Sequence, residues 1–225
     1  MRPRPGRLIR DGHQVACLDR NLAAAQTVAG EHPAIEMDVA DEDSVVAGFV
    51  QVKVAFGGLD ALATSAGIYE TTPMMETTVA TFRRVYDVNV IGTFLCLREA
   101  VPMMQAGARI CTVASVAGLR GGGLAGTISY ATSKGAVLAM TKNAARVLGP
   151  RGIAVNTVAP GMIETPFVAG PLAEPGMRER LEAMTSFGRL GTPEEIAEAI
   201  VWLLSPAASY VHGATLVADG GMVMY

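Results

Sequence analysis

Tyr130 and Lys134 are the two residues whose types and spacing point most directly to chemistry. They stand four residues apart in the run Ser-Tyr-Ala-Thr-Ser-Lys (129–134), at the start of a segment with helical periodicity. On a helix this spacing places both side chains on one face. A free tyrosine titrates near ~10, and a nearby ammonium favours the phenolate, which brings the pKa toward the range where acid-base catalysis is efficient. The pair predicts a proton-transfer site, although the same spacing also occurs on solvated helix faces.

The size and charge of the chain narrow the classes of function. It has 225 residues, half of them hydrophobic, and a formal net charge of -3. This length suits a single domain over residues 1–225 with one buried core. The weak negative charge supplies no field that would attract nucleic acid or an anionic membrane. We therefore expect small molecules, or further copies of the chain, as partners.

The cysteines and the N-terminus predict a cytoplasmic protein. Cys17, Cys96 and Cys111 are odd in number, far apart and set in apolar runs, which is typical of reduced core thiols. No Cys-His cluster indicates a metal site. Residues 1–10 are basic and atypical, without the apolar stretch of a signal peptide. Later apolar runs are interrupted before the ~20 residues that a membrane helix needs.

The elements that must position the Tyr-Lys pair alternate between short apolar runs and longer helical segments. This alternation predicts a doubly wound, Rossmann-like α/β fold with a parallel sheet. The segment 192–195 (Thr-Pro-Glu-Glu) reads as a helix cap, and 161–191 is a Gly- and Pro-rich substrate lid. The expected strands cover 13–18, 34–37, 59–64, 109–114, 153–158 and 214–217, and the helices 22–30, 41–56, 79–105, 129–148 and 196–204.

Acidic residues follow the first two recognisable strands. Asp19 stands where a doubly wound sheet places an acid on the adenosine ribose, which favours NAD over NADP because a carboxylate repels a 2′-phosphate. Arg20 beside it would soften that preference. Asp38, followed by Val39, stands at the height of the adenine edge. The alternatives are a surface acid for Asp19 and a helix N-cap for Asp38.

Several short motifs then occur in an order that resembles the short-chain dehydrogenase/reductase family. The resemblance runs from about Gly12 to Gly221. Each motif is weak alone, but several motifs in the order of the family do not arise together by chance. The motifs are Thr64-Ser65-Ala66-Gly67, Asn89 in Asp-Val-Asn-Val, Ser115 in Ala-Ser-Val-Ala-Gly, Tyr130 with Lys134, Pro160-Gly161, and Asp219-Gly220-Gly221.

The resemblance implies a catalytic tetrad of Asn89, Ser115, Tyr130 and Lys134. Tyr130 would exchange a proton with the oxygen of a secondary alcohol or ketone as hydride moves. Ser115 would hydrogen-bond that oxygen, and Lys134 would lower the tyrosine pKa and hold the nicotinamide ribose. Asn89 would hold a water that relays protons to the lysine. An asparagine bonded to helix backbone is the alternative for Asn89.

The resemblance also implies contacts with a nicotinamide cofactor. Small residues after the third recognisable strand would let the backbone approach the adenosine ribose. Here Thr64 and Ser65 replace the two amides of the family's usual Asn-Asn-Ala-Gly, which weakens that expectation. On the two sides of the cofactor the implied residues, besides Tyr130 and Lys134, are Ser65, Ala66 and Gly67, and Pro160, Gly161, Ile163 and Thr165.

The family's first strand and Gly-rich pyrophosphate turn have no counterpart in this sequence. Residues 7–13 read as the end of the first helix and its turn into the second strand, so a whole βα unit is expected to be absent. In a doubly wound sheet that strand lies between the second and the fourth. Two facing strand edges would be left unpaired or forced together. We interpret this as a truncated N-terminus, with a divergent member that has lost cofactor binding as the alternative.

Two classes of function follow. The first is an NAD-dependent oxidoreductase that interconverts a secondary alcohol and a ketone, assembled as a homodimer or homotetramer through helices 79–105 and 129–148. The second is a non-catalytic, truncated family remnant that acts as an oligomerisation or regulatory partner. An epimerase or dehydratase with the same pair is a further alternative. Apolar residues of the lid are expected to wall the substrate pocket, namely Met162, Phe167, Leu172, Met177 and Met184.

Overall fold

Strands and helices alternate along the whole described part of the chain. The computed structural model describes residues 6–122 and 127–224, so the first half of the atypical segment 1–10 lies outside the described residues. In chain order the elements are α1 (Gly6–Arg10), β1 (Cys17–Asp19), α2 (Leu22–Ala29), β2 (Ala34–Glu36), α3 (Glu42–Phe56), β3 (Ala61–Thr64), α4 (Val79–Tyr86), α5 (Gly92–Ala100), β4 (Arg109–Val113), α6 (Val116–Arg120), α7 (Ile128–Leu148), β5 (Ala154–Pro160), α8 (Ala169–Leu172), α9 (Met177–Glu182), α10 (Pro193–Leu203) and β6 (Thr215–Ala218). The predicted α/β class is confirmed.

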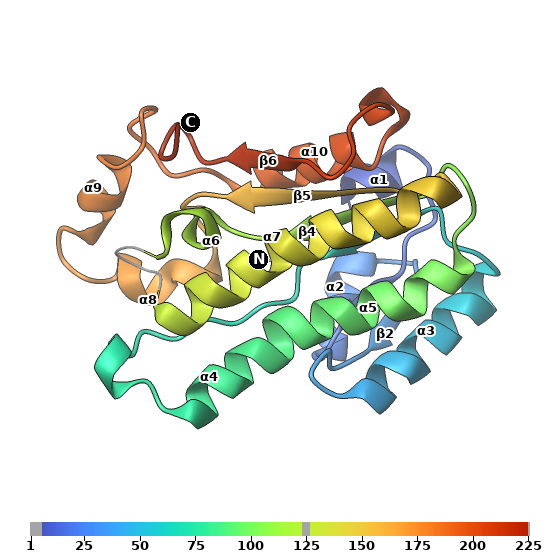
Figure 1. The fold of residues 1–225 in the computed structure, drawn as a ribbon, viewed down its shortest axis with the longest axis horizontal. Helices are drawn as coiled ribbons and strands as arrows, with labels where there is room; N and C mark the ends of the chain where they lie inside the picture. Colours follow the sequence, from blue (N-terminus) through green and yellow to red (C-terminus); the bar gives the residue numbers. More distant parts are fainter. Residues whose placement is uncertain (1–5, 123–126, 225) are drawn as a thin grey trace.

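All strand pairs are parallel, and within the described residues they form two separate sheets. The larger sheet has the order β3-β4-β5-β6. The smaller sheet pairs β1 with β2, in the register Cys17 with Ala34. Parallel neighbours require crossover connections, which the intervening helices provide. The arrowheads of β5 and β6 point toward the end of the molecule where α6, α8 and α9 lie (Figure 1).

Helices cover both faces of the larger sheet and create two apolar layers. Successive residues of a strand point to opposite faces, and β4 follows this rule: Ile110 packs with the cluster under α3, α5 and α7, whereas Cys111 packs with Ile196 and Ile200 of α10. All of these strand side chains are fully buried. This arrangement is the predicted doubly wound architecture, and it fixes the strand ends that carry the candidate site.

Local sequence signals set several helix boundaries as predicted. Thr192 and Glu195 form a capping box at the start of α10, where the Thr192 hydroxyl accepts from the Glu195 amide. The expected long helix over 79–105 consists of α4, a π-helical turn (Asp87–Ile91) and α5. The residue after the π turn is Gly92, and a side chain has no room there, because a Cβ would lie 2.7 Å from the Val39 side chain.

A large cavity separates the two sheets. It measures about 900 Å³ and is lined by the facing residues of both β1 and β3, with Leu8 of α1 and Ile200 of α10 also in its wall. Ala63, in the middle of β3, is exposed. Within the described residues, β1 pairs only with β2, and β3 only with β4. The edges of β1 and β3 that border the cavity thus have no strand partner within the described residues, and the absence of a whole βα unit stays a prediction.

The three cysteines are buried or partly buried in the described structure. All three cysteines are free, and burial raises the pKa of Cys96 and of Cys111 to about 12, so both thiols stay protonated. Over residues 6–122 and 127–224 no group of three His, Cys, Asp or Glu side chains is arranged to hold a metal ion. None of the described helices combines the length and the apolarity needed to cross a membrane.

Candidate active site

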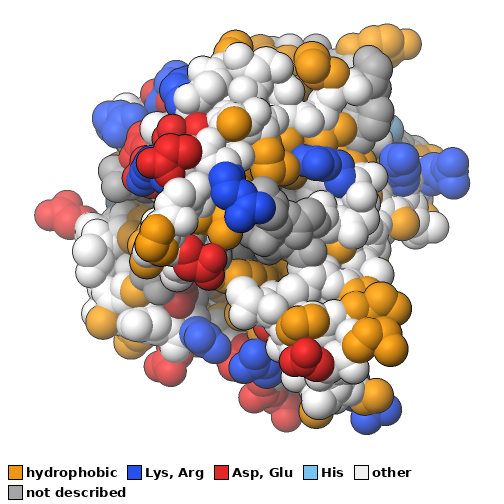
Figure 2. All heavy atoms as spheres, turned by 90° about the vertical axis from the view of Figure 1, so that its left-hand side faces the viewer, with side chains coloured by type: hydrophobic (Ala, Val, Ile, Leu, Met, Phe, Trp, Pro, Cys, Tyr) orange, Lys and Arg blue, Asp and Glu red, His pale blue; other side chains and the backbone are white. Residues whose placement is uncertain are grey.

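The residues of the Tyr-Lys site lie around a pocket at the carboxyl ends of the strands of the larger sheet. The pocket has a volume of about 110 Å³ and is walled mainly by apolar side chains. Figure 2 looks onto this end of the molecule and shows apolar side chains gathered around a hollow, with charged side chains nearby. The residues that line the pocket include Gly67, Tyr69, Ser115, Val116, Arg120, Tyr130, Lys134, Met162, Val168, Leu181, Met184 and Met222.

Tyr130 and Ser115 come together from two neighbouring helices. Tyr130 is in the first turn of α7, and Ser115 is the N-cap of α6, where its hydroxyl accepts from the Ala117 amide at 3.1 Å. Tyr130 also makes a side-chain hydrogen bond with Ser115. Burial raises the pKa of Tyr130 above its ordinary value of 10, and the bond to Ser115 opposes that rise. A substrate oxygen in this pocket would meet both hydroxyls.

Lys134 lies one helical turn beyond Tyr130 and is only 5 % exposed. Its ammonium donates to the Val113 carbonyl at 2.8 Å and lies 5.8 Å from the centre of the Tyr130 ring. Burial lowers the pKa of Lys134 from 10.5 to about 8. The expectation that Lys134 lowers the tyrosine pKa is wrong for this arrangement, because burial dominates at Tyr130 and the ammonium bonds to backbone instead of the phenol.

Asn89 links the residues after β3 to the helix that carries the Tyr-Lys pair. Its side chain is fully buried, accepts from the Ile68 amide at 2.8 Å and donates to the Ile68 carbonyl and to the Ser133 hydroxyl, each at 2.9 Å. The π turn that carries Asn89 is a form of helix frequent at functional sites. The alternative of a bond to helix backbone is wrong for the side chain, since its backbone partner, Ile68, lies outside the helices.

Two glycines allow close approaches at the site. A Cβ at Gly67 would lie 3.3 Å from the Asn89 Oδ1 and 3.5 Å from the Lys134 Nζ. A Cβ at Gly161 would lie 2.7 Å from the Cα of Asp219, so the segment after β5 passes directly beside the one after β6. The motif residues after β3, β5 and β6 are therefore brought to one end of the sheet, as the resemblance implied.

Glu70 is a buried acid at the site that no sequence pattern indicated. It accepts hydrogen bonds from the hydroxyls of Thr127 and Ser129, at the start of α7, and from the Thr72 amide at 2.6 Å. Burial raises the pKa of Glu70, but the hydrogen bonds from Ser129, Thr127 and Thr72 outweigh it and the pKa is lowered. Its hydroxyl partners lie 57 and 59 residues further along the chain, beyond the reach of any local signal.

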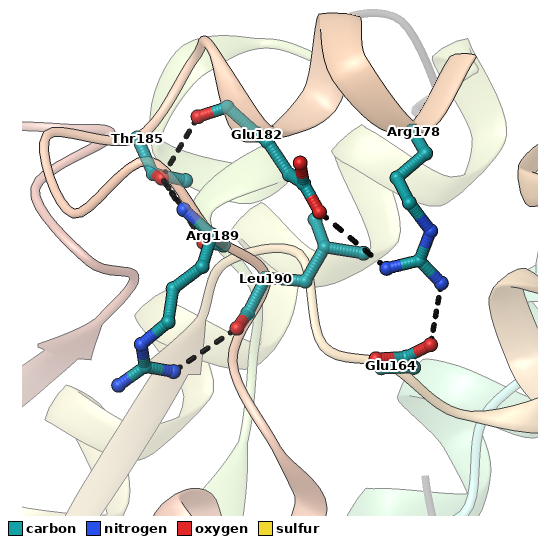
Figure 3. A network of polar contacts seen from close by, with 6 residues as sticks. All are labelled: Glu164, Arg178, Glu182, Thr185, Arg189 and Leu190. Carbon is teal, nitrogen blue, oxygen red and sulfur yellow. Dashed lines mark hydrogen bonds and ion pairs between the residues drawn. The ribbon is translucent and has the colours of Figure 1, made fainter. Parts of the chain in front are cut away.

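The lid over residues 161–191 is tied together by a polar network (Figure 3). Arg178 of α9 pairs with Glu164, and also with Glu182 one turn away. The Thr185 hydroxyl accepts from the Arg189 amide at 3.2 Å and donates to the Glu182 carbonyl at 3.0 Å. Because these contacts hold α9 over the strand ends, its apolar side is presented to the pocket.

The predicted apolar wall of the pocket is partly right. Met162 and Met184 line the pocket, together with Val168, Leu181 and Met222, which were not predicted. Leu172 and Met177 do not line it. The side chain of Phe167 lies outside the described residues.

The predicted cofactor residues divide between the pocket and the larger cavity. Gly67, Pro160, Gly161, Ile163 and Thr165 line the pocket with Tyr130 and Lys134, whereas Asp19, Val39 and Ala66 line the cavity between the sheets. Ser65 lines both, so the two spaces meet there.

The two acids after β1 and β2 are engaged locally. Asp19 accepts from the Asn21 amide at 2.9 Å, and Asp38 accepts from the Ala40 amide at 2.9 Å. The alternative that Asp38 caps the following helix is wrong, because Asp41 is the N-cap of α3. Asp38 lines neither the pocket nor the cavity.

Comparisons with known proteins agree with this geometry. Residues 6–223 match a family model described as enoyl-(acyl carrier protein) reductase. The chain is 38 % identical to 2,5-dichloro-2,5-cyclohexadiene-1,4-diol dehydrogenase of Sphingobium indicum, over 95 % of this chain and 88 % of that protein. It is 43 % identical to cis-4-hydroxycyclohexanecarboxylate dehydrogenase of Sinomonas cyclohexanicum, over 83 % of this chain and 75 % of that protein.

A solved structure shows the same fold. A short-chain dehydrogenase/reductase from Brucella melitensis, whose title also reads glucose/ribitol dehydrogenase, superposes with a TM-score of 0.90 at 33 % identity. The match covers 97 % of this chain and 89 % of that one.

Proposed function

This chain belongs to the short-chain dehydrogenase/reductase family, and we propose that it interconverts a secondary alcohol and a ketone by NAD(P)-dependent hydride transfer. The observation that carries the proposal is the meeting of Ser115, Tyr130 and Lys134 in one apolar pocket. Relatives named for cyclic alcohols support a ring-bearing substrate. A bound nicotinamide would supply or accept the hydride at the reacting carbon.

Tyr130 is the general acid and base of this proposal. Its raised pKa keeps the phenol protonated at neutral pH, so it is poised to donate to a carbonyl oxygen in the reducing direction. The Ser115 hydroxyl, already bonded to Tyr130, would bind the same oxygen and stabilise its developing negative charge. The mainly apolar wall lowers the local dielectric, which strengthens both interactions.

Lys134 and Asn89 support the proton transfer. With a pKa of about 8, Lys134 is able to gain and lose a proton near neutral pH, which suits a residue that returns protons to Tyr130. Asn89 fixes the segment around Gly67 beside that ammonium. A water relay through Asn89 remains part of the proposal.

The residues present fit parts of a nicotinamide dinucleotide. The pocket and the cavity meet at Ser65 and offer room for the two ends of the molecule. Asp19 in the cavity wall would receive the adenosine ribose, which supports NAD over NADP. The described residues contain no Gly-rich turn between a strand and a helix for the pyrophosphate.

We propose that one strand-turn-helix unit, expected from the family, completes the sheet between β1 and β3. The cavity of about 900 Å³ between these strands supports this, because adjacent strands in a sheet lie only ~4.8 Å apart and the cavity separates β1 from β3. The Thr64 hydroxyl, at the end of β3, is buried without a hydrogen-bond partner in the described residues. Completion of the sheet would supply such a partner and the missing phosphate turn.

Assembly through α4, α5 and α7 into a homodimer or homotetramer also remains a proposal. Ile91, the last residue of the π turn, is 47 % exposed, Phe94 of α5 is 46 % exposed, and Val147 of α7 is 63 % exposed. Exposed apolar side chains on long helices are typical of surfaces between subunits. Sedimentation analysis showing only monomers would reject the assembly.

NADH titration tests the enzyme proposal. We expect NADH to bind a version of the chain extended by the in-frame codons upstream of Met1. In that version Tyr130→Phe should abolish reduction of a cyclic ketone, while the affinity for NADH stays within about twofold of the wild-type value. The matched Tyr69→Phe variant, in the same pocket wall and 6.3 Å from the Tyr130 ring, keeps a general acid and is expected to retain turnover.

The same titration decides between this enzyme and a non-catalytic partner. The second candidate is favoured by the divided sheet and by the lack of a phosphate turn in the described residues. Failure of both the chain and the extended version to bind millimolar NADH would refute the enzyme proposal and leave the non-catalytic one.

A further inference from the structure

Arg120 lies in the wall of the substrate pocket and has no carboxylate partner among the described residues. It ends α6, the helix that Ser115 begins, and its side chain lines the pocket while remaining exposed to solvent. Four arginines of the described chain, Arg7, Arg98, Arg178 and Arg189, each contact a glutamate or aspartate, whereas Arg120 makes no such contact. Arg120 therefore offers a guanidinium to whatever enters the pocket.

The charges that line the pocket are all positive. Among its described lining residues there are two cations, Arg120 and Lys134, and no aspartate or glutamate. Lys134 is buried and its ammonium is held by the Val113 carbonyl. Arg120 is consequently the charged group that an incoming ligand meets first, against apolar walls that weaken solvent screening.

The position of Arg120 sets a distance from the reacting atoms. Arg120 follows Ser115 by five positions along α6, and a rise of 1.5 Å per residue separates the two by roughly 7.5 Å along the helix axis. The body of the pocket between them is apolar, with Val116 and Met162 in its wall. A six-membered ring suits such a gap, with an oxygen at one end and an anionic group at the other.

We propose that the pocket selects a cyclic secondary alcohol or ketone that carries a carboxylate on the side opposite the reacting oxygen, and that Arg120 binds this carboxylate. The inference rests on the proposed function, which supplies the oxygen's position at Ser115 and Tyr130. Arg120 is a specificity-determining residue in this proposal: a planar guanidinium binds a carboxylate through two parallel hydrogen bonds.

Calorimetric titration with two matched ligands tests the inference directly. The probes are 4-oxocyclohexanecarboxylate and its neutral carboxamide, which have nearly the same shape. Because a hydrogen-bonded ion pair at a partly exposed site adds little more than 1 kcal/mol, we expect the carboxylate to bind about fivefold to tenfold more tightly. Arg120→Met should remove this preference, Arg120→Lys should retain part of it, and added salt should weaken it.

Arg146→Met is the matched control. Arg146 is an exposed arginine in the last turn of α7 and does not line the pocket, so its loss should leave the carboxylate preference unchanged. Equal affinity for the two ligands, an unchanged preference in Arg120→Met, or no binding of the carboxylate at ~10 mM would each overturn the inference.

Measurement of ketone reduction separates this inference from the proposed function. If the extended chain reduces both ketones with NADH and Arg120→Met does not alter their relative KM, only the anion site fails. If the binding preference depends on Arg120 and neither ketone is reduced, the anion site stands and the proposed hydride transfer fails.

Discussion

Gly118→Ala should disturb the contact between the two helices that carry Ser115 and Tyr130. A Cβ at Gly118 of α6 would lie 2.6 Å from the Gly135 nitrogen and 2.6 Å from the Lys134 carbonyl carbon of α7. Favourable carbon contacts lie at ~3.5–4.0 Å, and the atoms in the way are backbone, which cannot rotate aside. The two helices must therefore move apart by about 1 Å.

The magnitude follows from two opposing effects. Overpacking of this kind costs ~1–3 kcal/mol, while alanine in place of glycine within a helix stabilises by ~0.5–1 kcal/mol. The facing position is the control: a Cβ at Gly135 would lie 3.6 Å from the Gly118 carbonyl oxygen, an ordinary contact, so Gly135→Ala should only stabilise. The same helix interface thus predicts opposite effects for two identical substitutions.

Thermal unfolding of the two variants measures the difference. At this chain length Tm changes by roughly 2–4 °C per kcal/mol, so we expect Gly118→Ala to melt below the wild type and Gly135→Ala at or above it. Because α6 begins at Ser115, the displacement should also reduce turnover, by up to ~100-fold for a 1 Å misplacement. A Gly118→Ala protein that melts as high as Gly135→Ala would refute the reasoning.

Three further substitutions have expected outcomes in unfolding experiments. Between pH 8 and 10 the folded chain has lost the Lys134 proton that the unfolded chain keeps, so the free energy of unfolding should rise with pH, by at most ~1.4 kcal/mol per pH unit. Lys134→Met should not show this rise. Above pH 10 the raised pKa of Tyr130 should make the free energy of unfolding fall with pH. Glu70→Gln should cost ~1–3 kcal/mol in urea unfolding, because Oε1 accepts from both hydroxyls at the start of α7 and Oε2 accepts from the Thr72 amide, and an amide has only one accepting oxygen for the two positions. A loss below ~0.5 kcal/mol would contradict the assigned contacts. The hydrogen bond from Arg189 is the largest cause that lowers the pKa of Glu195 to about 2. The free energy of unfolding of the wild type should therefore fall between pH 4.5 and pH 2, by under ~1 kcal/mol because the pair is exposed. Glu195→Gln should not show this fall.

Much of the fold followed from local patterns in the sequence. The start of α10 at Thr192 and the extent of α7 were predicted because capping and helical periodicity act over a few residues. β1 is shorter than the predicted run 13–18, and the predicted helix over 79–105 contains a π turn. The π turn is followed by Gly92, which lies against Val39 from a segment distant in the sequence, so local periodicity could not indicate this contact.

The candidate site divides in the same way. The spacing of Tyr130 and Lys134 on one helix is a property of the sequence, because an α-helix repeats every ~3.6 residues whatever surrounds it. Only the tertiary structure decides what the spacing does: Lys134 bonds to the Val113 carbonyl, burial raises the pKa of Tyr130, and Glu70 anchors the helix from a segment 59 residues away. Burial and long-range partners arise from the packing of the whole chain, and those two factors set the protonation and the charge that a substrate meets at Tyr130 and Arg120.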